Sequence, residues 1–407
     1  MKIETHSKMK KSILLIITFF TVFAVSAQST DSLVVLANKG VVTAQFKLAM
    51  RYLEQDDFKQ AVHWMECSAK NGHAEAQNNM GVYYQNGMVD GQHNYDKAFQ
   101  LYTASAEQGF VVAIYNLGLC YFNGRGTPAD RSKGVSLLKK SADMDYPPAQ
   151  YYTGVAYMNG FGVEKNMQTA LAYLEKSAEN NNAMATNQMG VLYEFGNGVL
   201  QNGQKAFSYY QKAANDYYLA AYNLAQCFFN GTGVLQDYRL ALQWFEKAAT
   251  ADYLPAIYNI GVFYDRGYGI TQDFVKAREY YQLAADKGYD LAQFNIASIY
   301  EAGQGLKQDF IKARKYFEMA SEQGFVRADY SIGNMYIEGR GVTKDYAKAI
   351  KHYTKAANGG HASAQFNLGL MYKTGIGVAP DLEKAKYWLK LAADQGDEEA
   401  KQELNKL

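Results

Sequence analysis

LPAIYNIGVFYDRGYGITQDFVKAREYYQLAADKGY, residues 254–289, carries a pattern that returns along the 407-residue sequence and therefore predicts its architecture. Its alanine belongs to a set of ten at intervals of 35 to 37 residues: Ala76, Ala113, Ala149, Ala185, Ala220, Ala256, Ala292, Ala328, Ala364 and Ala400. A period of about 20 to 50 residues is typical of solenoids, in which each unit contacts mainly its neighbours. We therefore expect one elongated array with an extended surface rather than an enclosed pocket.

Each unit of this pattern predicts a pair of antiparallel helices. In the quoted unit, residues at i, i+4, i+5 and i+8 form one stripe of a first helix: Ala256, Ile260, Gly261 and Tyr264. Gly267 and Gly269 can take positive φ and end that helix, and Asp273 is placed to cap a second helix that stops at Gly288. The chain is therefore expected to be all-α, with a glycine turn inside each unit.

The fifth position after each alanine admits only the smallest residues. It holds Gly81, Gly118, Gly154, Gly190, Ala225, Gly261, Ala297, Gly333 and Gly369. A glycine inside a helix costs about 1 kcal/mol relative to alanine, so its return indicates a compensating gain. We expect the partner helix to pass too close for a larger side chain, which makes these glycines structural. An aromatic ring three positions later is expected to fill the space beside them.

Charge and cysteine content limit the classes of function. Lys and Arg number 41 against 40 for Asp and Glu, which leaves no net field to attract a phosphate backbone. We therefore expect no nucleic-acid partner. Cys67, Cys120 and Cys227 lie in different units at unmatched positions, which favours buried apolar packing over a disulfide framework.

No catalytic, cofactor-binding or metal-binding motif stands out. The glycine pairs follow helices rather than strands and recur in almost every unit, so they indicate turns rather than a phosphate-binding loop. His73 and His361 occupy a slot that holds aromatic residues in other units, which favours packing over metal ligation. We expect a protein without enzymatic activity and with no cofactor or metal.

The first 27 residues predict a secretory signal peptide. Basic residues around Lys8 precede an apolar stretch from Ile13, and the small residues that end at Ala27 mark the cleavage site. The alternative is an uncleaved membrane anchor, but the stretch is shorter than the ~18 to 20 residues that a spanning helix needs. Both Met1 and Met9 remain candidate start sites. We expect export to the periplasm or the cell exterior, with no membrane insertion after cleavage.

Four segments of one unit carry a family resemblance: AQFNLGLMY at 364–372, GIGV at 375–378, DLEKA at 381–385 and KLAA at 390–393. In these segments the chain resembles the Sel1-like repeat family, a relative of the tetratricopeptide repeats. Nine copies from Ala76 onward carry the pattern. The resemblance implies a right-handed superhelical solenoid of antiparallel helix pairs that acts as an adaptor or scaffold for other proteins.

The copies also predict the domain organisation. Residues 28–41 are expected to form a short N-terminal linker, and residues 42–407 a single solenoid. Within it, residues 44–73 lack the Gly-x-Gly insertion and are expected to form a tetratricopeptide-like N-terminal cap. Nine repeats follow at about 74–397, and residues 398–407 are expected to form a polar C-terminal cap.

The third position after the repeat alanine is our candidate for peptide binding. It carries an amide in Asn79, Asn116, Asn223, Asn259, Asn295 and Asn367. Because an amide both donates and accepts hydrogen bonds, a row of amides on a concave face can clamp the backbone of an extended peptide. The resemblance supports this role, since tetratricopeptide proteins use inner-groove asparagines similarly. The alternative is that each Asn bonds within its own hairpin or to the next one.

Aromatic residues two positions after the alanine also admit two interpretations, a recognition surface or packing between repeats. They are Tyr115, Tyr151, Tyr222, Tyr258, Phe294, Tyr330 and Phe366. Their helical phase favours packing.

The function that these patterns favour is that of an exported, non-enzymatic scaffold that binds a protein or peptide partner through its concave surface. The alternative is a cell-wall protein that binds peptidoglycan or its peptides, or a weak β-lactam hydrolase. Relatives linked to β-lactam chemistry carry a cysteine pair in each repeat, whereas this chain has three cysteines in all.

Overall fold

The structure is a computed structural model that describes residues 29–407, all of whose regular elements are helices. The expected signal peptide lies outside these residues. The chain divides into two compact units, one that ends at Gln201 and one that spans Asn202–Leu407.

The N-terminal unit contains α2 (Thr30–Asn38), α3 (Val42–Glu54), α4 (Phe58–Lys70), α5 (Ala74–Gln85), α6 (Tyr95–Glu107), α7 (Val111–Asn123), α8 (Arg131–Asp143), α9 (Pro147–Asn159), α10 (Met167–Glu179) and α11 (Ala183–Phe195). The C-terminal unit contains α12 (Gly203–Ala213), α13 (Tyr218–Asn230), α14 (Tyr238–Ala249), α15 (Leu254–Arg266), α16 (Phe274–Asp286), α17 (Asp290–Ala302), α18 (Phe310–Glu322), α19 (Val326–Glu338), α20 (Tyr346–Asn358), α21 (Ala362–Thr374), α22 (Leu382–Asp394) and α23 (Glu398–Leu404).

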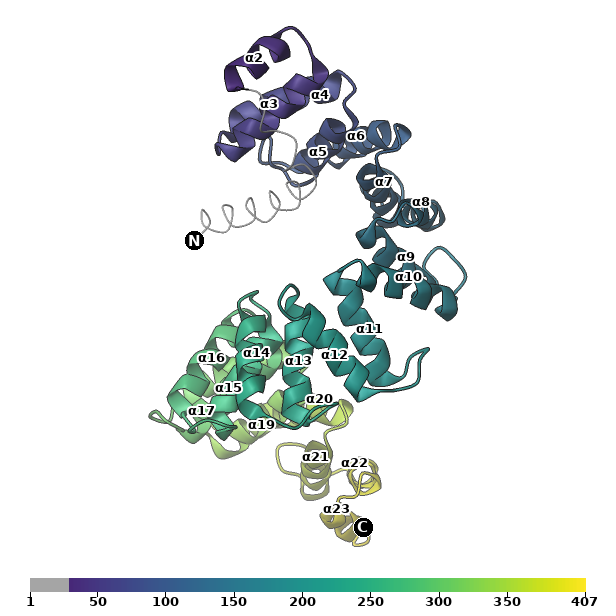
Figure 1. Ribbon diagram of the computed structural model, residues 1–407. Helices are drawn as coiled ribbons and strands as arrows, with labels where there is room; N and C mark the ends of the chain where they lie inside the picture. The colour runs from purple at the N-terminus through teal and green to yellow at the C-terminus, as the bar shows by residue number, and fades with distance from the viewer. Residues whose placement is uncertain (1–28) are drawn as a thin grey trace. The chain divides into compact units, whose positions relative to one another are not determined.

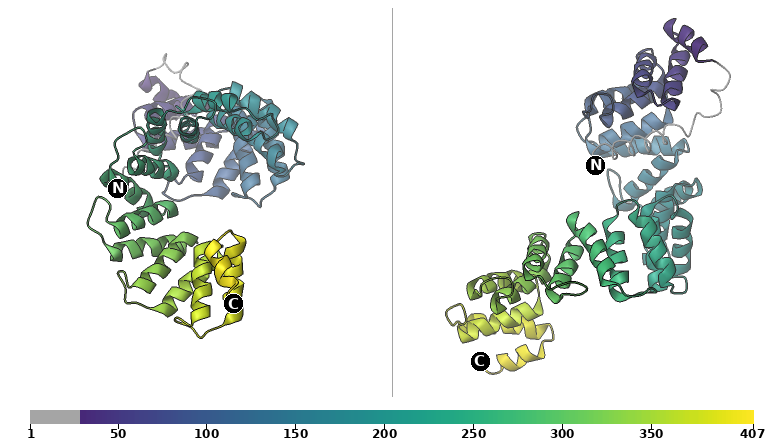
Figure 2. Two further views of the ribbon diagram at one scale, coloured as in Figure 1. Left: turned by 90° about the horizontal axis from the view of Figure 1, so that it is seen from below. Right: turned by 90° about the vertical axis from the view of Figure 1, so that its left-hand side faces the viewer.

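Within each unit, consecutive helices pair and the pairs stack on their neighbours, as α13 to α17 show (Figure 1). Figure 2 shows the same stacking of the C-terminal helices from two further directions. The predicted α-solenoid of antiparallel helix pairs is confirmed. Within each unit the core consists of buried alanines and rings between the helices, and Ala292, Ile296 and Phe317 are fully buried members in the C-terminal unit.

The helix ends form where the quoted stretch places them. The carboxylate of Asp273 accepts hydrogen bonds from the backbone N–H groups of Val275 and Lys276 and so caps α16. Gly267 ends α15 with φ of 70°. Gly269 has φ of 67°, and a Cβ added there would lie 2.8 Å from Cβ of Tyr238, at the start of the preceding repeat's second helix. The second glycine of the turn therefore allows both the bend and the contact between repeats.

Residues 30–38, which the sequence predicts as part of a linker, form helix α2. Ser29 caps this helix, and Leu33 and Ala37, one turn apart, are buried with Leu48 of α3. The Gln45 side chain donates a hydrogen bond to the carbonyl of Ala37, eight residues earlier. The same bond links repeats elsewhere in the chain, so α2 takes the place of a second helix before the first pair. The predicted linker is therefore wrong over these residues.

Candidate functional site

The first helices of the C-terminal unit present one solvent-accessible stripe, which we call the first-helix face. Its residues lie at i, i+4, i+7 and i+11 on each helix and so share one side. They are Leu219, Asn223, Gln226 and Asn230 on α13; Pro255, Asn259, Val262 and Arg266 on α15; Leu291, Asn295, Ser298 and Ala302 on α17; Arg327, Ser331, Asn334 and Glu338 on α19; and Ser363, Asn367, Leu370 and Thr374 on α21. Most are uncharged.

The predicted asparagines of this face are bonded from one repeat to the one before it. Nδ2 of Asn259 donates to the hydroxyl of Tyr222 at 3.4 Å, and Nδ2 of Asn295 donates to the hydroxyl of Tyr258 at 3.2 Å. The hydroxyl of Tyr353 donates to Oδ1 of Asn334, another residue of this face, at 2.6 Å. The amides of Asn259 and Asn295 are thus held in a fixed direction by the preceding repeat. An amide has two N–H donors and an acceptor, so one such bond does not exhaust its capacity.

In the N-terminal unit the two predicted asparagines are part of a buried contact. Asn79 is 4% exposed and accepts a hydrogen bond from Asn78, whose own oxygen accepts from Nδ2 of Asn116 at 2.8 Å. Asn78 stands where most repeats have an aromatic ring, and this polar pair replaces the ring contact. Asn79 therefore does not line a surface, and the expectation that it contacts a peptide is corrected.

The aromatic residue two positions after the repeat alanine contacts the ring at the last position of its own repeat. That last residue is also the N-cap of the next repeat's first helix. Tyr258 contacts Tyr289 with ring centroids 5.4 Å apart, and Phe294 contacts Phe325 at 5.1 Å. Tyr330 stacks on His361 at 4.4 Å. The rings thus pack where each repeat meets the first helix of the next, which supports the packing interpretation over a recognition surface.

The two histidines in this aromatic slot also act as helix caps. His73 stacks on Phe46, and its Nδ1 accepts the backbone N–H of Ala76. His361 likewise accepts from the N–H of Ala364. Burial lowers the pKa of both imidazoles, which keeps them neutral and able to accept at neutral pH. Within residues 29–407 no group of three or more His, Cys, Asp or Glu side chains is arranged to hold a metal ion.

The small-residue slot lies against the second helix of its own repeat. A Cβ added at Gly261 would lie 2.7 Å from Cδ1 of Tyr281, and one at Gly333 would lie 2.5 Å from Cδ1 of Tyr353. The same addition would meet Tyr102 at Gly81, Leu138 at Gly118, Leu174 at Gly154 and Leu389 at Gly369. Gly190 is buried in α11. The ring or branched side chain across the helix pair is what excludes a larger residue.

A glutamine bridge, which the sequence analysis missed, links three helices in several repeats. The glutamine that follows the repeat alanine donates through Nε2 to a carbonyl eight residues earlier, as Gln293 does to Ala285 at 3.2 Å. Its Oε1 accepts from an amide near the end of the repeat's own second helix, as from Gln323 at 2.8 Å. The same two bonds form at Gln45, Gln77, Gln150 and Gln365.

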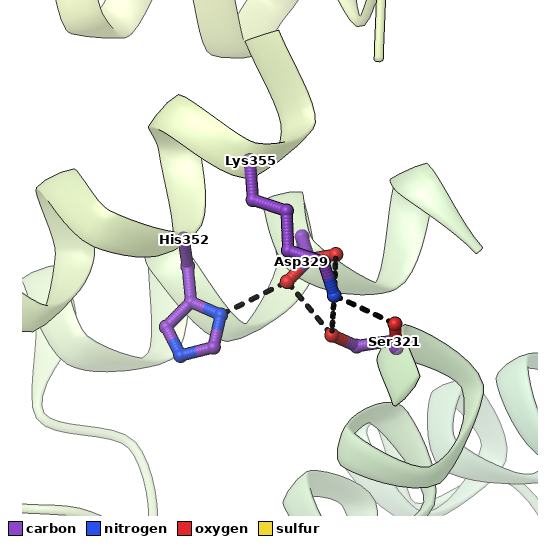
Figure 3. A network of polar contacts seen from close by, with 4 residues as sticks. All are labelled: Ser321, Asp329, His352 and Lys355. Carbon is purple, nitrogen blue, oxygen red and sulfur yellow. Dashed lines mark hydrogen bonds and ion pairs between the residues drawn. The ribbon is translucent and has the colours of Figure 1, made fainter. Parts of the chain in front are cut away.

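In the repeat of α19, Asp329 replaces this glutamine and forms a network of polar and charged contacts (Figure 3). Oδ1 of Asp329 accepts from the Ser321 hydroxyl at 2.8 Å and lies 3.0 Å from Nδ1 of His352, while Oδ2 lies 3.0 Å from Nζ of Lys355. A carboxylate cannot donate to the carbonyl of Ser321, and Lys355 supplies that hydrogen bond at 2.6 Å. Three coordinated replacements thus rebuild the bridge with charged groups.

The environment keeps this buried carboxylate ionised. Burial alone raises the pKa of Asp329, but hydrogen bonds from His352, Ser321 and Lys355 outweigh it and hold the pKa below its ordinary value. The sequence signal was present, because the position after the repeat alanine is acidic only here among the ten copies. The partners of Asp329 lie on α18 and α20, and only the packing of these helices shows that they meet it.

The Sel1 repeat family model matches ten consecutive segments: residues 42–73, 74–110, 111–146, 147–182, 183–217, 219–253, 254–289, 290–325, 326–361 and 362–397. The chain belongs to the Sel1 repeat family. The match includes residues 42–73, so the segment expected to be a cap is itself matched as a Sel1 repeat. Sel1 repeat proteins act as scaffolds for interactions with other proteins.

Two solved structures resemble this Sel1 repeat protein along much of its length. One is c5321, a protective antigen of uropathogenic Escherichia coli strains, with a TM-score of 0.58 and 27% identity over 93% of this chain and 90% of that one. The other is a Sel1 repeat protein from Oxalobacter formigenes, with a TM-score of 0.53 and 29% identity over 60% of this chain and 96% of that one.

Among curated proteins, an uncharacterized protein of Neisseria meningitidis is 33% identical over 104 residues, 26% of this Sel1 repeat chain. The match spans only 22% of the length of that relative. Across residues 29–407, no helix combines the length and apolar character needed to cross a membrane.

Proposed function

We propose that this Sel1 repeat protein is an exported scaffold that holds a protein or peptide partner on the first-helix face of its C-terminal unit. In this proposal, the face is taken to be the concave surface that the family resemblance implies. The observation that carries the proposal is the fixed amide row. Asn259 and Asn295 are each held by a tyrosine of the preceding repeat, so their amides repeat along the face at the solenoid period.

Such a row suits an extended polypeptide. A peptide in extended conformation offers alternating N–H and C=O groups, and an amide side chain pairs with either of them. Pre-oriented side chains lose little conformational freedom on binding, which favours affinity. The uncharged character of most of the face supports recognition of a backbone rather than a polyanion.

The test begins with the partner itself. Mild cross-linking in the envelope fraction followed by mass spectrometry identifies proteins that bind the chain. The affinity of the purified partner is then measured for wild type and for the triple variant Asn223→Ala, Asn259→Ala, Asn295→Ala. We expect at least a tenfold loss, since each lost polar contact is worth about 1 kcal/mol.

A matched control separates binding from packing. The variant Tyr222→Phe, Tyr258→Phe removes the hydrogen bonds between repeats but leaves the amides on the face, so we expect only the smaller loss of affinity that comes from lost pre-orientation, well below that of the triple variant. An equal loss of affinity in both variants would show that the amides stabilise the contact between repeats and do not themselves bind the partner. Unchanged affinity of a folded triple variant would rule out this face, and binding to purified sacculi in place of a protein would favour the cell-wall alternative.

Export has its own measurement. We propose that the signal peptide is removed after Ala27, so N-terminal sequencing of the protein from the periplasmic or secreted fraction should begin at Gln28. A protein that retains residues 1–27 in that fraction would contradict cleavage.

A further inference from the structure

Helix α19 interrupts the chemistry of the first-helix face. In the three preceding repeats, the partly buried residue just before the repeat alanine is apolar: Leu219, Pro255 and Leu291. In α19 this position holds Arg327. One turn later the asparagine of the row is replaced by Ser331, which lies on the same side of the helix. Two neighbouring positions, the exposed Arg327 and the partly buried Ser331, thus depart from the pattern together.

The Arg327 side chain lies over an aromatic ring of the preceding repeat. Its Cζ is 4.7 Å from the centroid of the Phe294 ring, a cation–π arrangement. Phe294 is itself held between Phe317 and Phe325. A guanidinium stacked in this way keeps its planar N–H fork available at its edges, the geometry that binds a carboxylate with two hydrogen bonds.

Arg327 also differs from the other charged groups nearby in lacking an acidic partner. Arg266 pairs with Asp265 at 3.4 Å, and Glu338 pairs with Arg340 at 2.8 Å. Over residues 29–407, Arg327 forms no ion pair with a carboxylate. Asp329, two residues away, does not fill this role, because it is buried and already paired with Lys355.

We propose that Arg327, together with the Ser331 hydroxyl, binds a carboxylate of the peptide that lies on the first-helix face. The carboxylate belongs to an Asp or Glu side chain or to a free C-terminus. The inference rests on the proposed function and adds a residue preference to it. The amides on α15 and α17 hold the backbone, and the guanidinium of α19 sets the charge and register of the bound segment.

A synthetic library of random decapeptides tests the inference on the purified chain, with one arm carrying a free C-terminal carboxylate and the other a C-terminal amide. Bound peptides are identified by mass spectrometry. We expect wild type to enrich Asp and Glu in both arms if side chains bind, or only the free-carboxylate arm if the C-terminus binds. Arg327→Glu should lose this enrichment at least tenfold and select Lys and Arg instead.

Two further variants make the outcome specific. Arg327→Lys keeps the charge but not the fork, so we expect a partial loss. Lys351→Glu makes the same net charge change at an exposed position of α20 and should leave the selection unchanged. Enrichment without a carboxylate preference, or a preference that survives Arg327→Glu, would overturn the inference and leave the proposed function standing. No enrichment by folded wild-type protein would overturn both.

Discussion

The carboxylate of Asp329, only 1% exposed, lies 3.0 Å from the ammonium group of Lys355, whose side chain is 51% exposed. The pair occupies the place where five other repeats use a neutral glutamine bridge. A buried ion pair is costly to form, and removing one partner leaves the other buried and uncompensated. This junction between α18, α19 and α20 should therefore respond to substitution more sharply than its neutral counterparts.

Replacing Lys355 by methionine should destabilise this junction. Methionine is the residue that the preceding repeat has at the equivalent position, Met319. We expect a loss of about 2 kcal/mol, because the variant leaves the carboxylate of Asp329 and the carbonyl of Ser321 without their shared donor. Amide hydrogen exchange resolved over α19 and α20 measures the local loss.

The matched control for that substitution is the triple variant Ser321→Ala, Asp329→Gln, Lys355→Met, which removes the charges and restores the bond from the glutamine Nε2 to the carbonyl of residue 321, as in the Gln293 repeat. We expect it to recover most of the protection. Equal exchange in wild type and Lys355→Met would contradict the role given to Lys355.

The stability of the junction should depend on acid through Asp329. Its pKa is lowered in the folded state, so its contribution is present above the unfolded pKa of about 3.9 and is lost as the pH falls through the folded value. The stability difference between wild type and Asp329→Asn should therefore shrink as the pH is lowered from 6 toward 2. Urea unfolding at a series of pH values measures it, and a constant difference would contradict the assignment.

Adding one methyl group at Gly261 should destabilise the protein although alanine favours helix. The new Cβ would overlap the ring of Tyr281, and such overpacking costs about 1 to 3 kcal/mol. Where the chain itself has alanine in this slot, at Ala225 and Ala297, the residue twenty positions later is Phe245 or Phe317. Tyr281→Phe should therefore recover part of the loss, since a ring without its hydroxyl is freer to shift. Thermal unfolding of the two single variants and the double variant measures this coupling.

Truncating Phe294 to alanine removes the ring that joins two repeats and supports Arg327. Because this ring packs against Phe317 and Phe325 but is only half-buried, we expect a cost of about 3 kcal/mol, at the lower end for Phe-to-Ala changes. A thermal melt identical to wild type would show that the ring contributes little to packing.

The repeat, the helix pairs, the turn glycines and the packing of rings such as Phe294 could all be predicted from the sequence, because each depends on residues at fixed, short spacing. A helix stripe and a cap need only local order to be recognised. Helix α2 escaped prediction because it lacks a repeat of its own, and its burial depends on contacts with α3.

The polar groups that meet across repeats could not be predicted in this way, because their pairing depends on how the helices pack in three dimensions. Asn79 shares its repeat position with Asn295, yet the first is buried beside Asn78 and the second lies on a surface. Asp329 and Lys355 are 26 residues apart, and their pairing arises because the second helix folds back over the first. Periodic spacing fixes the position of a side chain within its repeat. Its partner is set by the helix that packs against it, and that packing depends on the identities of residues in three helices at once.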